Sequence, residues 1–167
     1  MLNTADVISA IKARRSVRQF KSDPVPREVI EDIIDCGRLA PSARNDQPWE
    51  FVVVTHQATR EAIADVTTYG KFIADAPVCV LAFARRTPRY MEDTCAAVEN
   101  MLIAAQAYGL ATCWIAGENT PYALEVGRIV GAPEAMRLVA LFPIGYSDQS
   151  PHPNKRSLGE VLHWEHY

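Results

Sequence analysis

Three arginines and a serine near the N-terminus are the first residues whose types and spacing suit chemistry: Arg14, Arg15, Ser16 and Arg18. Guanidinium groups offer forked N–H donors that match the oxygens of a phosphate. The apolar residues before them place Arg15 on the apolar side of a first helix, and a cation aimed into a domain usually meets an anion. Basic residues are also favoured in the last turn of any helix, which is the more common reason for such a cluster. Both interpretations stay open on these residues alone.

A second basic pair, Lys155 and Arg156, lies in a polar segment near the C-terminus. Alone, such a pair is typical of a solvated charged surface. The two basic clusters could also converge on one phosphate in a protein that is otherwise slightly acidic.

A polar loop between two prolines is the next candidate. It contains Pro41, Ser42, Ala43 and Asn45 and ends at Pro48. The prolines stiffen the loop, and its hydroxyl and amide groups suit a planar polar ring. An ordinary turn is the alternative, because serine, asparagine and proline favour turns in any case.

A small-residue turn after an apolar run forms the third group, which comprises Ile115, Ala116 and Gly117. A glycine there would let a backbone N–H approach a ligand closely. The sequence contains no dinucleotide-binding glycine fingerprint, no P-loop and no nucleophile elbow. His163 and His166 have no third ligand nearby, and we interpret them as surface histidines rather than a metal site.

The elements that must position these groups follow from periodicity and caps. The first helix is expected to begin at an Asn3 or Thr4 cap and to end near Ser16. The second begins with Pro26 in its first turn and buries a stripe that runs from Val29 to Leu39. Further helices are expected over 60–66, over 90–108 with Gly109 as its C-terminal cap, and from Thr120 to about Gly131. Strands are expected over 49–55, 78–84, 111–116 and 138–144. Helices and strands mix without a strict βαβ rhythm, which favours an α+β fold.

Two features predict unusual burial. The helix over 90–108 is apolar most of the way round, so it is central or is shared with another subunit. In the tail, Leu162 and Trp164 alternate with polar residues at the period of a half-buried strand. The tail could pack on its own domain or reach across a dimer, and periodicity does not decide between the two.

The composition limits the class of protein. The chain has 167 residues, 49% of them hydrophobic and 22% charged, with a net charge of −3. These values fit one globular domain over residues 1–167 and argue against a broad nucleic-acid surface. The four cysteines have no metal-ligand spacing and suggest core positions in a reducing compartment. No signal peptide or membrane span is predicted, so we expect a soluble, cytoplasmic protein.

Taken together, the candidate motifs resemble the FMN-dependent nitroreductase family, in the family's order and near its spacing, from about Ile8 to the C-terminus. The motifs are Arg14-Arg15-Ser16-Val17-Arg18-Gln19-Phe20, Ala40-Pro41-Ser42 followed by Asn45-x-Gln47-Pro48-Trp49, Trp114-Ile115-Ala116-Gly117, and Pro153-x-Lys155-Arg156.

This resemblance implies a homodimer of α+β subunits, each with a central, mainly antiparallel sheet flanked by helices and an exchanged C-terminal arm, and with two FMN sites at the interface. It assigns Arg14, Arg15, Ser16 and Arg18 to the flavin phosphate, ribityl and pyrimidine groups, and Lys155 and Arg156 to the phosphate. It assigns the loop with Pro41, Ser42, Ala43 and Asn45 to the partner's flavin. It places Ile115, Ala116 and Gly117 at flavin N5.

The activity it implies is hydride transfer from NAD(P)H to FMN, followed by ping-pong reduction of a small acceptor such as a nitroaromatic or a quinone. No side chain is assigned as acid, base or nucleophile, because the cofactor carries the chemistry. A specialised flavin enzyme of the same family, such as a dehalogenase, and a non-catalytic FMN-binding module are the alternatives. The sequence departs from larger members at Tyr69-Gly70-Lys71, where those place an asparagine beside the pyrimidine.

Overall fold

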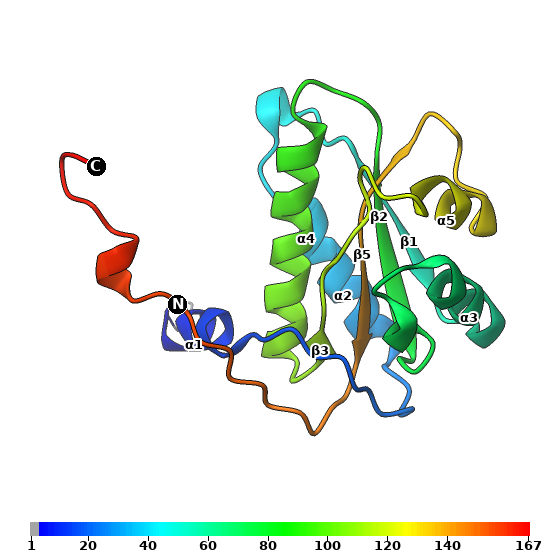
Figure 1. Cartoon of the computed structure of the whole chain (residues 1–167), viewed down its shortest axis with the longest axis horizontal. Helices are drawn as coiled ribbons and strands as arrows, with labels where there is room; N and C mark the ends of the chain where they lie inside the picture. Colours follow the sequence, from blue (N-terminus) through cyan, green and yellow to red (C-terminus); the bar gives the residue numbers. More distant parts are fainter. Residues whose placement is uncertain (1–3) are drawn as a thin grey trace.

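The computed structural model describes residues 4–167, and its centre is a twisted antiparallel sheet (Figure 1). Within those residues the sheet has five strands in the order β1-β2-β5-β3, with β4 also paired to β5. The strands are β1 Trp49–Val54, β2 Val78–Ala84, β3 Ala111–Thr112, β4 Ile115–Ala116 and β5 Arg137–Gly145. Every ladder between them is antiparallel, which confirms the expected α+β fold class.

Helices cover both faces of this sheet. They are α1 Thr4–Ala13, α2 Arg27–Arg38, α3 Gln57–Val66, α4 Tyr90–Ala107 and α5 Ala123–Ile129. α2 and α4 pack on one face, whereas α3 and α5 pack on the other (Figure 1). Alternate residues of β2 therefore enter two separate cores, with Val80 in the first and Leu81 in the second, and the whole strand is buried.

The sequence predicts that the helix over 90–108 is either central or shared with another subunit, and in the structure α4 is central. Val98 and Leu102 belong to the core beneath the sheet. α2 approaches α4 so closely that a Cβ on Gly37 would lie 2.6 Å from Cγ of Met101. The helix ends as predicted, because Gly109 follows it with a φ of +72°, in the left-handed region that favours glycine.

The predicted strand over 111–116 is instead two short strands. The β3 and β4 ladders share one register on β5, and that register places Cys113 opposite Pro143. Proline has no N–H to donate, so the ladder is interrupted at this point. Cys113 and Trp114 belong to neither strand, and pairing with β5 resumes in the same register at Ile115.

Several predicted element ends are also wrong. α1 ends at Ala13, so Arg15 lies beyond the helix and not on its apolar side. The last helix, α5, begins at Ala123 instead of Thr120. Leu39 follows α2 as its C-cap and is 65% exposed, so it is not part of the buried stripe. The possible Asn3 cap lies outside the described residues.

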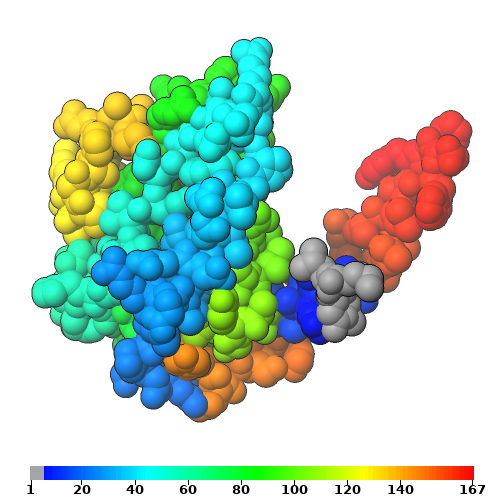
Figure 2. Space-filling model, turned by 180° about the vertical axis from the view of Figure 1, so that it is seen from behind, coloured from blue at the N-terminus to red at the C-terminus, as the bar shows by residue number. Residues whose placement is uncertain are grey.

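The tail does not form the predicted strand. Residues 146–167 contain one short 3-10 turn, Leu158–Glu160, and Leu162 and Trp164 are exposed. Figure 2 shows the tail standing off the body of the molecule. Side-chain alternation makes a strand only where another strand supplies hydrogen-bond partners, and none lies beside this segment of the chain as described. Across residues 4–167, none of the helices combines the length and apolar character needed to cross a bilayer.

Candidate functional site

The two basic clusters of the sequence lie together in the structure. A cleft of about 510 Å³ separates the segment after α1 from the start of the tail. It is lined by Arg14, Arg15, Ser16, Arg18, Pro151, His152, Pro153 and Lys155. Arg156 does not line the cleft and is exposed. We call this space the basic cleft.

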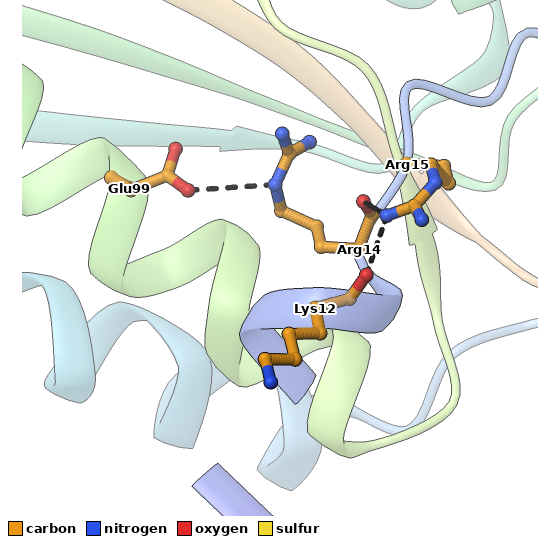
Figure 3. A network of polar contacts seen from close by, with 4 residues as sticks. All are labelled: Lys12, Arg14, Arg15 and Glu99. Carbon is orange, nitrogen blue, oxygen red and sulfur yellow. Dashed lines mark hydrogen bonds and ion pairs between the residues drawn. The ribbon is translucent and has the colours of Figure 1, made fainter. Parts of the chain in front are cut away.

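The first two arginines of the basic cleft have partners within the chain (Figure 3). Nε of Arg14 lies 3.4 Å from a carboxylate oxygen of Glu99 on α4. Nη1 of Arg15 donates to the carbonyls of Lys12 and Arg14, at 2.6 Å and 2.7 Å. Arg15 therefore caps the C-terminal end of α1, which is the ordinary role that the sequence left open.

Arg18 differs from both. Its side chain has no ion pair or hydrogen bond with residues 4–167, and only its backbone N–H is engaged, by Gln149 at 3.4 Å. The same side chain lines a second hollow of about 340 Å³. Arg18 thus borders both spaces.

The second hollow, here the aromatic pocket, is walled mainly by rings and by the edge of β4. Its lining comprises Arg18, Thr68, Tyr69, Phe72, Cys113, Trp114, Ile115, Ala116, Thr120, Pro121 and Tyr122. Phe72 also stacks on Phe20, with ring centroids 6.4 Å apart. Burial raises the pKa of the Tyr122 hydroxyl and of the Cys113 thiol above their ordinary values, so both stay protonated at neutral pH.

Ile115 and Ala116, two of the three residues of the small-residue turn, line this pocket, but Gly117 does not. The N–H of Gly117 donates to the carbonyl of Val139 at 3.0 Å and so is not available to a ligand. A Cβ on this glycine would lie 2.6 Å from Cγ of Leu138 and 2.7 Å from its carbonyl oxygen. The close approach of β5 therefore requires a glycine at this position.

The loop with Pro41, Ser42, Ala43 and Asn45 lies apart from both spaces. It sits at the N-terminal end of α4, where Asp93 Oδ1 accepts the N–H of Ala43 at 3.0 Å (Figure 1). No residue of this loop lines the basic cleft or the aromatic pocket of its own subunit. The structure therefore brings members of three of the four motif groups to these two spaces and leaves the polar loop at a distance.

Sequence reasoning missed part of the aromatic pocket, notably Phe72 and Tyr122. Phe72 reads as one more apolar residue before a strand. Tyr122 lies at the expected start of a helix, and nothing in its neighbours signals that its hydroxyl reaches back six residues to Ala116. Only the turn that folds the chain back on itself makes that contact.

Fold and site together define a class: an α+β subunit in which a basic cleft and an aromatic pocket share one arginine, Arg18. The model of the nitroreductase family matches residues 11–68 and 66–146. A Methanothermobacter thermautotrophicus protein, assigned provisionally as an NADH dehydrogenase/NAD(P)H nitroreductase, is 33% identical over 156 residues, covering 87% of this chain and 80% of that protein. This chain belongs to the nitroreductase family.

Two further similarities bear on the activity. The structure of an FMN-dependent nitroreductase from Clostridium difficile superposes with a TM-score of 0.89 at 26% identity, covering 96% of this chain and 99% of that one. An iodotyrosine deiodinase from Thermotoga neapolitana is 28% identical over 177 residues, covering 90% of this chain and 92% of that protein. The family and the fold expected from the motifs are confirmed.

Proposed function

We propose that the protein is an FMN-dependent oxidoreductase that takes hydride from NAD(P)H and reduces a small acceptor such as a nitroaromatic or a quinone. The observation that carries this proposal is the position of Arg18, which lines both the basic cleft and the aromatic pocket. One molecule with a phosphate at one end and a flat ring at the other would extend past this shared residue and occupy both spaces. Family membership places the activity in the flavin oxidoreductases.

The residues present fit FMN. Arg18, the remaining donors of Arg15, and Lys155 would hold the phosphate, because charge-assisted bonds from guanidinium and ammonium groups are the strong ones. Arg14 and Ser16 would bind the polar chain between phosphate and ring, and Ile115 and Ala116 would border the ring. When bound, FMN supplies reversible hydride acceptance and donation, which no side chain of this protein can perform. Positive charge near the pyrimidine would stabilise the reduced, anionic ring.

The loop at Pro41, Ser42, Ala43 and Asn45 is part of the proposal only through a second subunit. It contacts neither space in its own chain, yet its stiff, polar character suits a ring edge. In a homodimer of the kind implied by the family resemblance, this loop would reach the neighbour's flavin, and Arg156 would close over a phosphate with its tail. Exposed apolar side chains on α1, namely Val7, Ile8 and Ile11, support a partner surface on this side of the molecule.

The decisive experiment is the visible spectrum of the purified protein before and after anaerobic NAD(P)H. We expect a yellow protein whose flavin band bleaches on addition of the nucleotide. A flavin that stays unbleached would favour the non-catalytic FMN module. A colourless protein that cannot take up FMN would overturn the proposal.

Kinetics test how the substrates share the site. If NAD(P)H and the acceptor occupy the aromatic pocket in turn, double-reciprocal plots at several acceptor concentrations give parallel lines. Intersecting lines would mean that both bind together, which contradicts a shared pocket.

The dehalogenase alternative has support of its own in the similarity to the Thermotoga neapolitana deiodinase. The anaerobically reduced protein can be mixed with a nitroaromatic or with 3-iodotyrosine. Faster return of the yellow colour with the nitroaromatic supports the proposal. Faster return with the iodinated amino acid, with release of iodide, would favour the alternative.

A further inference from the structure

The side chain of Tyr122 makes one contact that the proposed activity has not yet used. This residue precedes α5, is 6% exposed, and presents its ring to the aromatic pocket. Its hydroxyl donates to the carbonyl oxygen of Ala116 at 2.5 Å. This hydrogen bond links the Tyr122 ring, which lines the aromatic pocket, to the backbone of β4 at Ala116.

Strand geometry shows how Ala116 is oriented. In an antiparallel pair, residues alternate between those whose N–H and C=O groups point at the partner strand and those whose groups point away. Gly117 donates to Val139 of β5 at 3.0 Å, so its neighbour Ala116, opposite Ala140, is of the second kind. Both the N–H and the C=O of Ala116 therefore point away from β5, on the edge that borders the aromatic pocket.

The peptide between Ala116 and Gly117 is consequently held at both ends, by the Tyr122 hydroxyl at its oxygen and by Val139 at its nitrogen. Since the hydroxyl already engages one lone pair of the Ala116 carbonyl, the outward group of this residue that is fully available to a ligand is its N–H. The edge acts as a hydrogen-bond donor. An unoccupied carbonyl beside a ring nitrogen would instead oppose that nitrogen's lone pair.

We propose that Tyr122 is a positioning residue: it fixes the Ala116 peptide and restricts this edge to donating a hydrogen bond to the bound ring. This inference rests on the proposed function, because it assumes that a ring with an acceptor nitrogen occupies the aromatic pocket. Tyr122 transfers no proton or electron itself and acts through the backbone that it holds.

Substitution Tyr122→Phe removes the hydroxyl and keeps the ring that fills the wall. The control is Tyr90→Phe, because the Tyr90 hydroxyl on α4 donates to the side chain of Glu118, in the turn after β4, at 2.9 Å and not to the carbonyl of Ala116. In flavin-free protein, amide hydrogen exchange at Gly117 should accelerate about 2- to 12-fold in Tyr122→Phe, the loss expected for one neutral hydrogen bond. The control should exchange like the wild type at this amide.

With FMN bound, Tyr122→Phe should shift the visible band and the reduction potential of the flavin. It should also lower kcat about 2- to 12-fold with little change in KM for NAD(P)H, whereas Tyr90→Phe keeps wild-type values. Equal behaviour of the two variants, or a Tyr122→Phe protein with wild-type exchange and flavin potential, would overturn the positioning role. A wild-type protein that takes up no FMN overturns the proposed function instead, and the exchange result at Gly117 separates the two failures.

Discussion

Three arginines follow α1 within five positions, and each has a different environment. Arg14 is held by Glu99, and Arg15 is turned onto the carbonyls that end the helix. The guanidinium of Arg18 makes no hydrogen bond or ion pair with residues 4–167, and Arg18 lines both spaces. A phosphate gains most from donors that have no internal partner to give up, so Arg18 should contribute most to holding one.

We therefore expect Arg18→Ala to weaken FMN binding about 10- to 150-fold, the range for one charge-assisted bond of about 1.5–3 kcal/mol. Arg128→Ala is the matched control, because Arg128 forms an exposed pair with Glu125 on α5 and lines neither space. Flavin fluorescence titration gives both dissociation constants. Retention of wild-type affinity in Arg18→Ala would contradict the phosphate role.

At the scale of elements, the loop before β1 is held in an unfavourable shape. Arg44, Asn45 and Gln47 have φ values of +55°, +59° and +45°, in the left-handed region that non-glycine residues rarely adopt. Asp93 holds the loop by accepting the N–H of Ala43, and its other carboxylate oxygen is buried without a partner in the described residues. Such strain persists only where the surroundings enforce it.

Asp93→Ala should release this loop, lowering stability by about 1–3 kcal/mol and weakening FMN binding if the loop serves a flavin. Asp93→Asn keeps an oxygen for Ala43 and should restore most of both. Thermal unfolding and flavin titration measure the two effects. The holding role is contradicted if the asparagine variant is as impaired as the alanine variant.

Elements that depend on local signals were predictable from the sequence. The ranges of β1 and β2 follow from apolar runs, interrupted in β1 by Glu50 alone, and the end of α4 follows from Gly109. The break between β3 and β4 was not predictable from the sequence, because it depends on Pro143 of β5 lying opposite Cys113. Likewise, the candidate residues of the basic cleft could be named from their types, but the partners of Arg14 and Arg15 and the hydroxyl contact of Tyr122 come from folding.

At the scale of the whole molecule, apolar side chains remain uncovered on one side. Val7, Ile8 and Ile11 of α1 are each nearly half exposed, and Trp164 in the tail is 79% exposed. Exposed apolar side chains in such numbers are typical of a surface that contacts another protein. A homodimer joined through this side would cover it.

Truncation after Gly145 should therefore give a monomer that loses FMN, as size-exclusion chromatography with absorbance at the flavin band would show. The control is the full-length double variant Lys155→Ala and Arg156→Ala, which removes the charges and keeps the arm. It should lose affinity for FMN but remain dimeric. A truncated protein that stays dimeric and yellow would exclude an exchanged arm.

The buried thiol of Cys79 gives the fold a dependence on alkaline pH. Complete burial raises the pKa of Cys79 from 9.0 to about 12. Between these values the thiol ionises in the unfolded chain but stays protonated in the folded one. The unfolded state then binds fewer protons, so the free energy of unfolding falls as pH rises, by up to about 1.4 kcal/mol per pH unit from this group.

Urea unfolding of wild type and Cys79→Val at pH 8, 9.5 and 10.5 tests this dependence. The variant has a side chain of similar size without a titrating proton and should lose stability less steeply above pH 9. Identical slopes would show that the thiol ionises as readily in the folded protein as in the unfolded chain.

The strained loop lies at one end of α4, and the segment that follows α1 lies toward the other end. This separation has a consequence for mixed dimers. If each flavin needs the basic cleft of one chain and the loop of the other, Arg18→Ala and Asp93→Ala damage opposite halves of a site. Refolding the two variants together at equal amounts would put both lesions in one site of each mixed dimer and neither in the other. Random pairing then restores about a quarter of the sites to wild type, by complementation between two impaired chains.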